Sequence, residues 1–407
     1  MVQAVARPDR TLWWLRAIYL LMGMMFWYGI EQLFLDKYLH NPSARGYLTA
    51  VFTASLVLFD VPAGIIADRV GRKVCLVGAA IAQIAGLLVL GSSDSLTTYL
   101  IGTVIFGLYL CLFNGAAQAL LYDWLASRGE TKLYAKQQGT MYALWLTGAG
   151  IANLLSGFIA HFWGLRSAYF LSIIPGLVAL YALRKLAEPA HESKTESPWY
   201  SHVLDAVREI RTHRKIAGFA LQFMAATVVL MTIGEFGQIY ILSFGVGTIM
   251  LGLLWAVDAA FAAGGRALAH RLQLRPRLAI SLFCLVLAAF ALTQSAIGIG
   301  LFWLLYGLNE AVSNIAETEI QDATSSHIRA TMLSLINFAG NVLAIPVVLL
   351  FTAYYRDHGI MAANRLVIIA VVGILLGTLF IKPVKHRNTS APHAPDTLPE
   401  PKVQQVL

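Results

Sequence analysis

Charged residues are scarce in this chain. Asp, Glu, Lys and Arg make up 13% of its 407 residues, whereas soluble domains carry roughly a quarter. Hydrophobic residues account for 58%. Because a soluble core could not hide that much apolar surface, the composition excludes an ordinary soluble protein and predicts one embedded in a membrane.

Paired cysteines and catalytic motifs are missing as well. The three cysteines, Cys75, Cys111 and Cys284, lie in apolar runs without paired spacing, which argues against a disulfide framework and a zinc site. The sequence has no H-E-x-x-H motif, no G-x-G-x-x-G motif and no Walker-type loop. A membrane enzyme, such as a lipid-modifying transferase, would need an arrangement of this kind. We therefore expect no metal, no cofactor and no enzymatic activity.

The chain consists instead of long apolar runs. Each is near the ~20 residues that a helix needs to cross a bilayer. Small residues at 4–6 precede the first run, the wrong order for signal-peptide cleavage, so the first helix is expected to stay in the mature protein. The pattern predicts an all-α membrane protein with twelve transmembrane helices, at 12–39, 44–67, 74–92, 96–126, 138–162, 167–187, 216–243, 247–270, 278–296, 298–322, 328–354 and 363–382.

Positive charge gathers on one side of this topology. The net charge of +8 comes from Lys and Arg in loops that all fall on the same face, at 127–136, 184–215, 271–277 and 382–387. The opposite loops have little beyond Lys37, Arg45, Arg166, Arg356 and Arg365. An excess of Lys and Arg marks cytoplasmic loops, so we expect a multi-pass protein of the cytoplasmic (inner) membrane with both termini in the cytoplasm. The orientation of the protein in the membrane therefore explains its net positive charge, and we reject a nucleic-acid partner.

One long polar interval, 188–215, divides the twelve predicted helices into two sets of six. The predicted units are an N-terminal six-helix bundle (1–187), a cytoplasmic linker (188–215), a C-terminal six-helix bundle (216–383) and a disordered cytoplasmic tail (384–407). Within the linker, apolar residues recur at helical spacing and predict an amphipathic helix: Trp199, Val203, Leu204, Val207 and Ile210, opposite Arg208 and Arg211. A tether between the halves is favoured over a regulatory helix.

A compact charged motif follows the second apolar run. It consists of Gly64, Asp68, Arg69, Gly71, Arg72 and Lys73. It resembles the motif G-x-x-x-D-R-x-G-R-K between the second and third helices of the major facilitator superfamily. The resemblance implies two six-helix bundles with a substrate site at their interface, in a monomeric carrier in the lipid bilayer that moves a small molecule by alternating access.

The same resemblance implies a latch on the cytoplasmic side. Asp68 would meet the N-terminus of the eleventh helix, in the segment 328–335, where the helix dipole favours an anion. Arg72 would pair with Asp123, at the cytoplasmic end of the fourth helix. Such contacts would hold the two halves together in the outward-facing state. The alternative is that these are ordinary interfacial charges.

Acids within the apolar runs are candidates for the site, because an unpaired charge there is expensive. They are Glu31, Asp60, Glu235, Asp258, Glu310 and Glu317. The family's geometry, in which the first, fourth, seventh and tenth helices line the cavity, selects Glu31, Glu235 and Glu310. A buried carboxylate can exchange a proton near neutral pH, which is a physical basis for proton coupling. For each acid, a helix–helix hydrogen bond remains an alternative.

Glu31 is the favoured acid. Its neighbours include Trp27, Tyr28 and Gln32, and an acid flanked by aromatic rings could attract a cationic or amphipathic substrate. Neutral polar residues on the selected helices add further candidates: Asn114, Gln118, Gln238 and Asn309. Arg266 is expected to reach Asp258 only through an intermediate residue or water.

These features favour a secondary transporter that exports a small organic compound by proton antiport. A proton-coupled importer and a non-transporting sensor on the same fold remain alternatives. The fifth helix bears on this choice, because drug/proton antiporters of the superfamily have a G-P-x-x-G-G run where this chain has Ala152-Asn153 and Ser156-Gly157. The missing proline weakens the case for antiport. In the fourth helix Thr103 occupies the place of an arginine found in many relatives.

Overall fold

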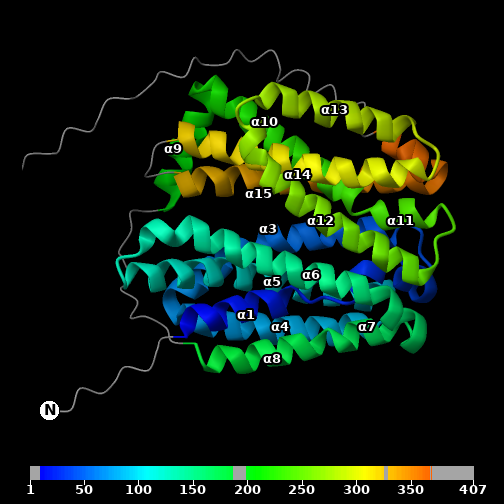
Figure 1. The fold of residues 1–407 in the computed structure, drawn as a ribbon, viewed down its shortest axis with the longest axis horizontal. Helices are drawn as coiled ribbons and strands as arrows, with labels where there is room; N and C mark the ends of the chain where they lie inside the picture. Colours follow the sequence, from blue (N-terminus) through cyan, green and yellow to red (C-terminus); the bar gives the residue numbers. More distant parts are fainter. Residues whose placement is uncertain (1–9, 187–198, 325–328, 367, 369–407) are drawn as a thin grey trace, which may run out of the picture.

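The computed structural model describes residues 10–186, 199–324, 329–366 and 368, and within these ranges the regular structure is entirely helical (Figure 1). The elements are α1 (Thr11–Gly23), η1 (Tyr28–Ile30), α2 (Glu31–Phe34), η2 (Leu35–Leu39), α3 (Ala44–Val70), α4 (Arg72–Gly91), α5 (Leu96–Ala126), η3 (Thr131–Leu133), α6 (Tyr134–Trp163), α7 (Leu165–Leu171), α8 (Ile173–Arg184), α9 (Trp199–Thr212), α10 (Arg214–Val229), η4 (Leu230–Gly234), α11 (Gly237–Leu242), α12 (Thr248–Leu272), α13 (Pro276–Leu292), α14 (Ile297–Ala323) and α15 (Arg329–His358).

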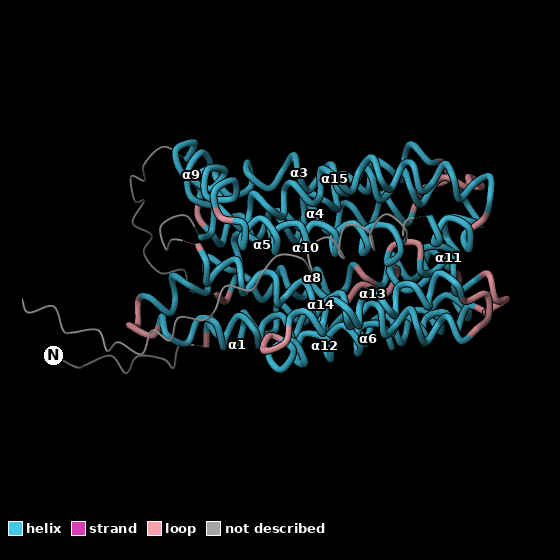
Figure 2. Tube along the Cα trace, turned by 90° about the horizontal axis from the view of Figure 1, so that it is seen from above, coloured by secondary structure: helices cyan, strands magenta, loops and turns pink. Residues whose placement is uncertain are grey.

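The helices form two halves, each with its own core. One cluster of buried side chains is drawn from the segments between α1 and α8, and a second from those between α10 and the residues after α15. The halves lie one above the other in Figure 1, and the helices of both run roughly along the long axis (Figure 2). Contact between the halves runs mainly through α3 with α15 and α6 with α12.

Eight helical segments of the described residues are long and apolar enough to cross a bilayer. They are Thr11–Leu39, Arg72–Gly91, Leu96–Ala126, Thr131–Trp163, Leu165–Arg184, Arg214–Leu242, Thr248–Ala269 and Thr331–His358. The helix α13 is apolar but shorter. The predicted twelfth span, 363–382, begins within a helical stretch at 360–366 but lies largely outside the described residues, as does the predicted tail.

The loop after the second span is shorter than the sequence predicts. The apolar runs end at residue 67 and resume at 74, but α3 continues to Val70 and α4 already begins at Arg72. Only Gly71 is non-helical, with φ of +109°, a conformation that residues with a Cβ rarely adopt. Arg and Lys are good helix formers, so these charges extend the helices instead of ending them.

The first and seventh spans are broken, although both are predicted as continuous. In the first, α1 ends at Gly23 and the chain turns before η1, α2 and the π-helical η2. In the seventh, α10 passes into the π-helical η4, and a turn at 235–236 precedes α11. Irregular backbone of this kind inside a membrane protein often lines a binding site. The two breaks occupy corresponding positions in the two halves.

The amphipathic helix predicted in the linker is present as α9. It packs against α10 and α15, and Ala206 is fully buried in a small core shared with them. Leu204 and Val207, which were placed on the apolar face, are exposed. The first part of the linker, 188–198, lies outside the described residues.

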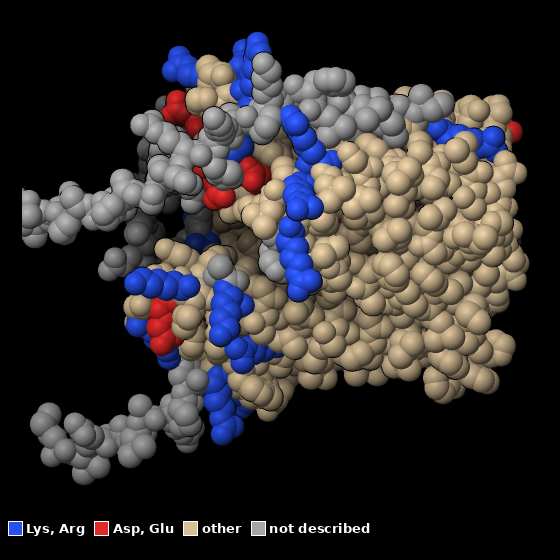
Figure 3. All heavy atoms as spheres, turned by 45° about the horizontal axis from the view of Figure 1, so that its top comes forward, with Lys and Arg blue, Asp and Glu red and all other residues tan. Residues whose placement is uncertain are grey.

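The two ends of the molecule differ. Lys and Arg cluster at the end formed by the α3–α4, α5–α6 and α12–α13 connections, hereafter the charged end, and the surface is hollowed there between the halves (Figure 3). The opposite end is tightly closed. A Cβ added at Gly157 of α6 would lie 2.6 Å from the Thr248 carbonyl oxygen, and one added at Gly252 would lie 2.7 Å from the Gly157 nitrogen. Glycine therefore allows the backbones of α6 and α12 to touch.

Candidate functional site

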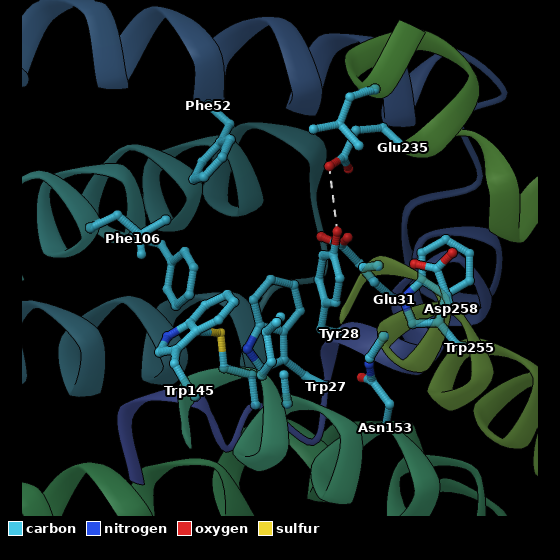
Figure 4. A pocket seen from close by; sticks show the side chains of 18 of the residues that line it. Trp27, Tyr28, Glu31, Phe52, Phe106, Trp145, Asn153, Glu235, Trp255 and Asp258 are labelled. Carbon is cyan, nitrogen blue, oxygen red and sulfur yellow. Dashed lines mark hydrogen bonds between the residues drawn. The ribbon is translucent and has the colours of Figure 1, made fainter. Parts of the chain in front are cut away.

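A cavity of about 340 Å³ lies between the two halves (Figure 4). One side of its wall comes from the broken first span together with α3, α5 and α6. The other side comes from the broken seventh span, α12 and α14. Both helix breaks therefore face the same space.

Aromatic rings form much of the wall. They belong to Trp27, Tyr28, Phe52, Phe106, Tyr142, Trp145, Trp255 and Tyr306. Trp27 packs edge-to-face on Phe106 with ring centroids 5.3 Å apart, within the first half. Tyr28 meets Trp255 of the other half at 6.2 Å. Such surfaces bind flat, apolar groups through dispersion and ring–ring contacts.

Glu31, at the start of α2, is paired within its own half. Its Oε2 lies 2.5 Å from Arg45 Nη1, and its Oε1 accepts a hydrogen bond of 2.8 Å from the Tyr99 hydroxyl. Both side chains of the ion pair are buried. The placement of Arg45 in an outside loop was therefore wrong: Arg45 lies in the first turn of α3 and is turned inward, because the acid beside it compensates its charge.

Glu235 follows η4 in the other half and contacts the first half. Its Oε1 accepts a hydrogen bond of 3.4 Å from the Tyr28 hydroxyl, drawn as the dashed line in Figure 4. Its Oε2 lies 3.8 Å from Arg45 Nη1. Arg45 thus stands between a carboxylate of each half, nearer to Glu31 than to Glu235.

Gln238 joins the two broken spans directly. Its Nε2 donates to the Tyr28 carbonyl oxygen at 2.6 Å, and its Oε1 accepts from the Gln32 backbone nitrogen at 2.9 Å. One amide of α11 therefore satisfies two backbone groups at the break in the first span. Gln32 is buried, and its own side chain accepts from Arg45 and donates to Asp36.

The acids on α12 and α14 have different surroundings. Glu310 accepts a hydrogen bond of 2.8 Å from Arg266 Nε, and the Arg266 guanidinium lies 4.3 Å from the centroid of the Tyr142 ring of the first half. The expected water-linked contact of Arg266 with Asp258 is thus replaced by an ion pair with Glu310. Asp258 is 5% exposed, and its Oδ1 has no hydrogen-bond partner.

The structure brings half of the predicted substrate residues to the cavity wall. Those in the wall are Trp27, Tyr28, Glu31, Glu235 and Glu310. Gln32 and Gln238 lie behind it, in the contact between the broken spans. Asn309 lines a separate space of about 10 Å³. Asn114 and Gln118 are exposed and do not belong to this wall.

Two charged residues of the wall were missed by the selection from sequence. Arg45 stands at the start of an apolar run, where an arginine usually marks the membrane interface. The sequence nevertheless indicated such a role for an arginine, because the several acids within the apolar runs need a cation nearby. Asp258 was recognised as an intramembrane acid but set aside because its helix, the eighth, is not one of the four selected. Its position as an acid inside an apolar run was enough to make Asp258 a candidate for the site.

The predicted latch is described in part. Arg72 Nε lies 3.6 Å from Asp123 Oδ2, within the first half at the charged end. Lys73 donates a hydrogen bond of 2.8 Å to the Leu186 carbonyl oxygen, and Arg69 is exposed. The side chain of Asp68, residues 325–328 and the side chains at 329–330 lie outside the described part of the structure. The role of these residues as a latch stays a prediction.

Comparison with known sequences decides the family. A sequence profile described as the Major Facilitator Superfamily matches residues 12–348. The chain belongs to this superfamily. Among curated relatives, the putative uncharacterized transporter YgaY of Escherichia coli (strain K12) is 29% identical over 146 residues. The match covers 36% of this chain and spans 35% of that relative.

Solved structures agree with this assignment. A bacterial homolog of the human lysosomal transporter Spinster superposes with a TM-score of 0.71 at 19% identity, covering 92% of this facilitator and 96% of the homolog. The nucleoside transporter NupG gives 0.71 at 14%, with coverage of 91% and 98%, and a D-xylose-proton symporter gives 0.71 at 16%, with 91% and 96%. The predicted fold of two six-helix bundles is thereby confirmed, and the chain is a multi-pass membrane protein of this superfamily.

Proposed function

We propose that this facilitator exports a small organic compound from the cytoplasm in exchange for protons, by alternating access. The observation that carries the proposal is Arg45, which lies between Glu31 of one half and Glu235 of the other at the edge of the shared cavity. The charged end faces the cytoplasm in this proposal, because Lys and Arg gather there. The termini are then cytoplasmic and the membrane is the inner membrane.

Proton binding would act on the contact between the halves. When Glu235 is ionised, its attraction to Arg45 adds to the hydrogen bonds that keep the opposite end closed. Substrate bound from the cytoplasm and in contact with both halves would compete with this attraction and favour separation of the broken spans at this end, which opens the cavity to the outside. Glu235 would then take up a proton from the outside, the halves would return without substrate, and release of the proton to the cytoplasm would restore the pair with Arg45, so that protons enter as substrate leaves. A proton can shift the equilibrium in this way because it binds the two conformations differently.

The cavity wall supports an organic substrate. Rings from both halves face the space, so a flat, largely apolar compound could contact both halves at once. A ligand held by both halves is carried from one opening to the other when they rock. We propose that the protein works as a monomer in the bilayer, because the cavity is formed within one chain.

Import is the second candidate. The solved relatives include a D-xylose-proton symporter, and the fifth helix has Ala152-Asn153 where antiporters have Gly-Pro. In an importer the same carboxylates would bind proton and substrate on the same side. A sensor on this fold would bind a ligand without moving it.

Flux measurements in proteoliposomes of known orientation separate these possibilities. Ligands are first found by the thermal stabilisation of the purified protein with a chemically broad panel, and their flux is then followed under an imposed pH difference. Export predicts that substrate and protons move in opposite directions, whereas movement together would establish import. Binding without flux would indicate a sensor that does not transport its ligand.

Glu235→Gln tests the coupling residue. The variant should lose accumulation driven by the pH difference but retain exchange of labelled for unlabelled substrate, because exchange needs no net proton movement. Asp94→Asn, which removes an exposed acid that pairs with Arg166 and does not line the cavity, is the matched control. If Glu235→Gln accumulated substrate as well as the wild type does, Glu235 would have no part in coupling.

A further inference from the structure

Three of the four carboxylates in the cavity wall already have partners in the protein. Glu31 has Arg45 and Tyr99, and its two oxygens are both engaged. Glu310 has Arg266 at 2.8 Å. Glu235 has Tyr28 and shares Arg45. In the ion pairs of the described residues, the guanidinium groups of Arg45 and Arg266 are therefore bound to these three acids.

Asp258 is the fourth, and the ion pairs of the described residues do not include it. It lies in α12, its Oδ1 has no hydrogen-bond partner, and it is almost completely buried. A carboxylate in such a place is costly unless it is neutralised by a proton or a cation. With four acids and two arginines, the region has an excess of negative charge that a cationic ligand would offset.

The surroundings of Asp258 suit an organic cation better than a bare metal ion. Trp255 lies one turn earlier on α12, and both residues face the cavity, as Figure 4 shows. Tyr28 packs on Trp255 at 6.2 Å, and Tyr306 of α14 lines the same wall. Aromatic faces attract ammonium-type cations and also accept their apolar substituents. A metal ion would need several oxygen ligands, and the described residues contain no such cluster.

We propose that Asp258 binds the positively charged group of the substrate and that the substrate is an amphipathic organic cation. This inference rests on the proposed function, because it names the substrate class of the same cavity. It replaces Glu31, which the sequence alone favours for this role, since Arg45 already neutralises Glu31. Trp255 and Tyr28 would contact the apolar part of the cation.

Two probes of nearly the same shape and opposite charge test the proposal. Tetraphenylphosphonium and tetraphenylborate both enter detergent micelles, so their difference reports charge recognition by the protein. Binding is followed at pH 7 on the purified full chain by quenching of tryptophan fluorescence and by the shift of the thermal midpoint. The wild type should bind tetraphenylphosphonium saturably and should show no saturable response to tetraphenylborate. Equal responses to both, or none to tetraphenylphosphonium, overturn the proposal.

Substitutions at Asp258 test whether its charge is responsible for tetraphenylphosphonium binding. Asp258→Asn keeps the shape and should weaken tetraphenylphosphonium binding by about tenfold to a hundredfold, the range expected when a buried ionic contact without a hydrogen bond is lost. Asp258→Glu should retain most of the affinity. Asp94→Asn, an exposed acid outside the cavity, should bind as the wild type does. Unchanged affinity of Asp258→Asn for tetraphenylphosphonium would contradict the assignment of Asp258 as the residue that binds the cation.

The measurements also separate this inference from the proposed function. Asp258→Asn should have a thermal midpoint without ligand that is equal to or above the wild type, because it removes a buried charge, and so lost binding is not lost folding. Binding that depends on Asp258 without any flux in proteoliposomes would contradict the transport proposal alone. Flux of a neutral compound that is insensitive to Asp258→Asn would contradict this inference alone.

Discussion

The two broken spans make a useful comparison, because each places a glutamate at the edge of the same cavity. Glu31, in the first half, is buried in an ion pair and a tyrosine hydrogen bond from its own half. Glu235, in the second half, is less buried, and its described partners, Tyr28 and Arg45, belong to the first half. Glu31 is thus held by partners of its own half, whereas Glu235 is held across the boundary between the two halves.

This difference suggests separate roles for two acids that look alike in the sequence. A charge pair inside one half keeps the same geometry when the halves rock, so it contributes mainly to stability. A pair across the boundary exists in only one conformation, so its protonation can bias the equilibrium between conformations. The contacts of Gln238 also cross the boundary, because its amide binds two backbone groups at the break in the first span.

Removal of Arg45 should have the largest effect on this comparison. Arg45→Met leaves Glu31 buried without its cation, which should cost about 3–5 kcal/mol of stability and abolish transport. The double variant Arg45→Met with Glu31→Gln should recover most of the stability, because no unpaired charge remains. Thermal midpoints of the four proteins in the double-mutant cycle check this. Equal loss in the single and double variants would mean that Glu31 and Arg45 do not stabilise one another.

Loss of the Gln238 amide should have an intermediate effect. Gln238→Leu leaves the Gln32 N–H and the Tyr28 carbonyl without partners in the closed state, a cost of about 1–3 kcal/mol for that state. Both backbone groups can meet water when the halves separate, so the equilibrium should move toward the open arrangement. Distances between spin labels on α3 and α15 measure the shift. An unchanged distance distribution would argue that the amide serves packing only.

The contact at the charged end should have the smallest effect on stability. Arg72 and Asp123 are partly exposed and belong to the same half, so Asp123→Asn should cost less than about 1 kcal/mol. If the motif is a conformational latch, the variant should change the transport rate while its thermal midpoint stays near the wild-type value. The measurement is initial flux beside thermal unfolding. A loss of flux that matches a loss of folded protein would assign the pair a structural role.

Much of the fold could be predicted from local pattern. Apolar runs near 20 residues long located the first eleven spans to within a few residues, and the linker helix was recognised from its spacing. The breaks at Gly23 and at 235–236 were not predicted, because each lies inside a run that is long enough for one continuous helix. The backbone groups at the first break bind side chains from distant parts of the chain, Ser172 and Gln238, and no local pattern encodes these contacts.

The site was predicted less completely, for a related reason. Glu31, Glu235 and Glu310 were found because an acid in an apolar run is conspicuous. Arg45 was assigned to a loop because an arginine at the end of a run usually reaches water. Its inward orientation follows from its contacts with Glu31 and Gln32 of α2, which form only when α3 packs beside α2.

By itself, the sequence determined that this protein lies in a membrane, where its first eleven spans lie and which end of them carries the positive loops. Those properties are sums over neighbouring side chains, since each residue contributes its own free energy of transfer to lipid or water. Tertiary structure alone decided which acids pair with an arginine and that Asp258 has no ion pair among the described residues. Arg45, Glu235 and Asp258 come from three separate segments of the chain, with Arg45 and Asp258 213 positions apart, and only the packing of the two halves sets the distances on which charge interactions depend.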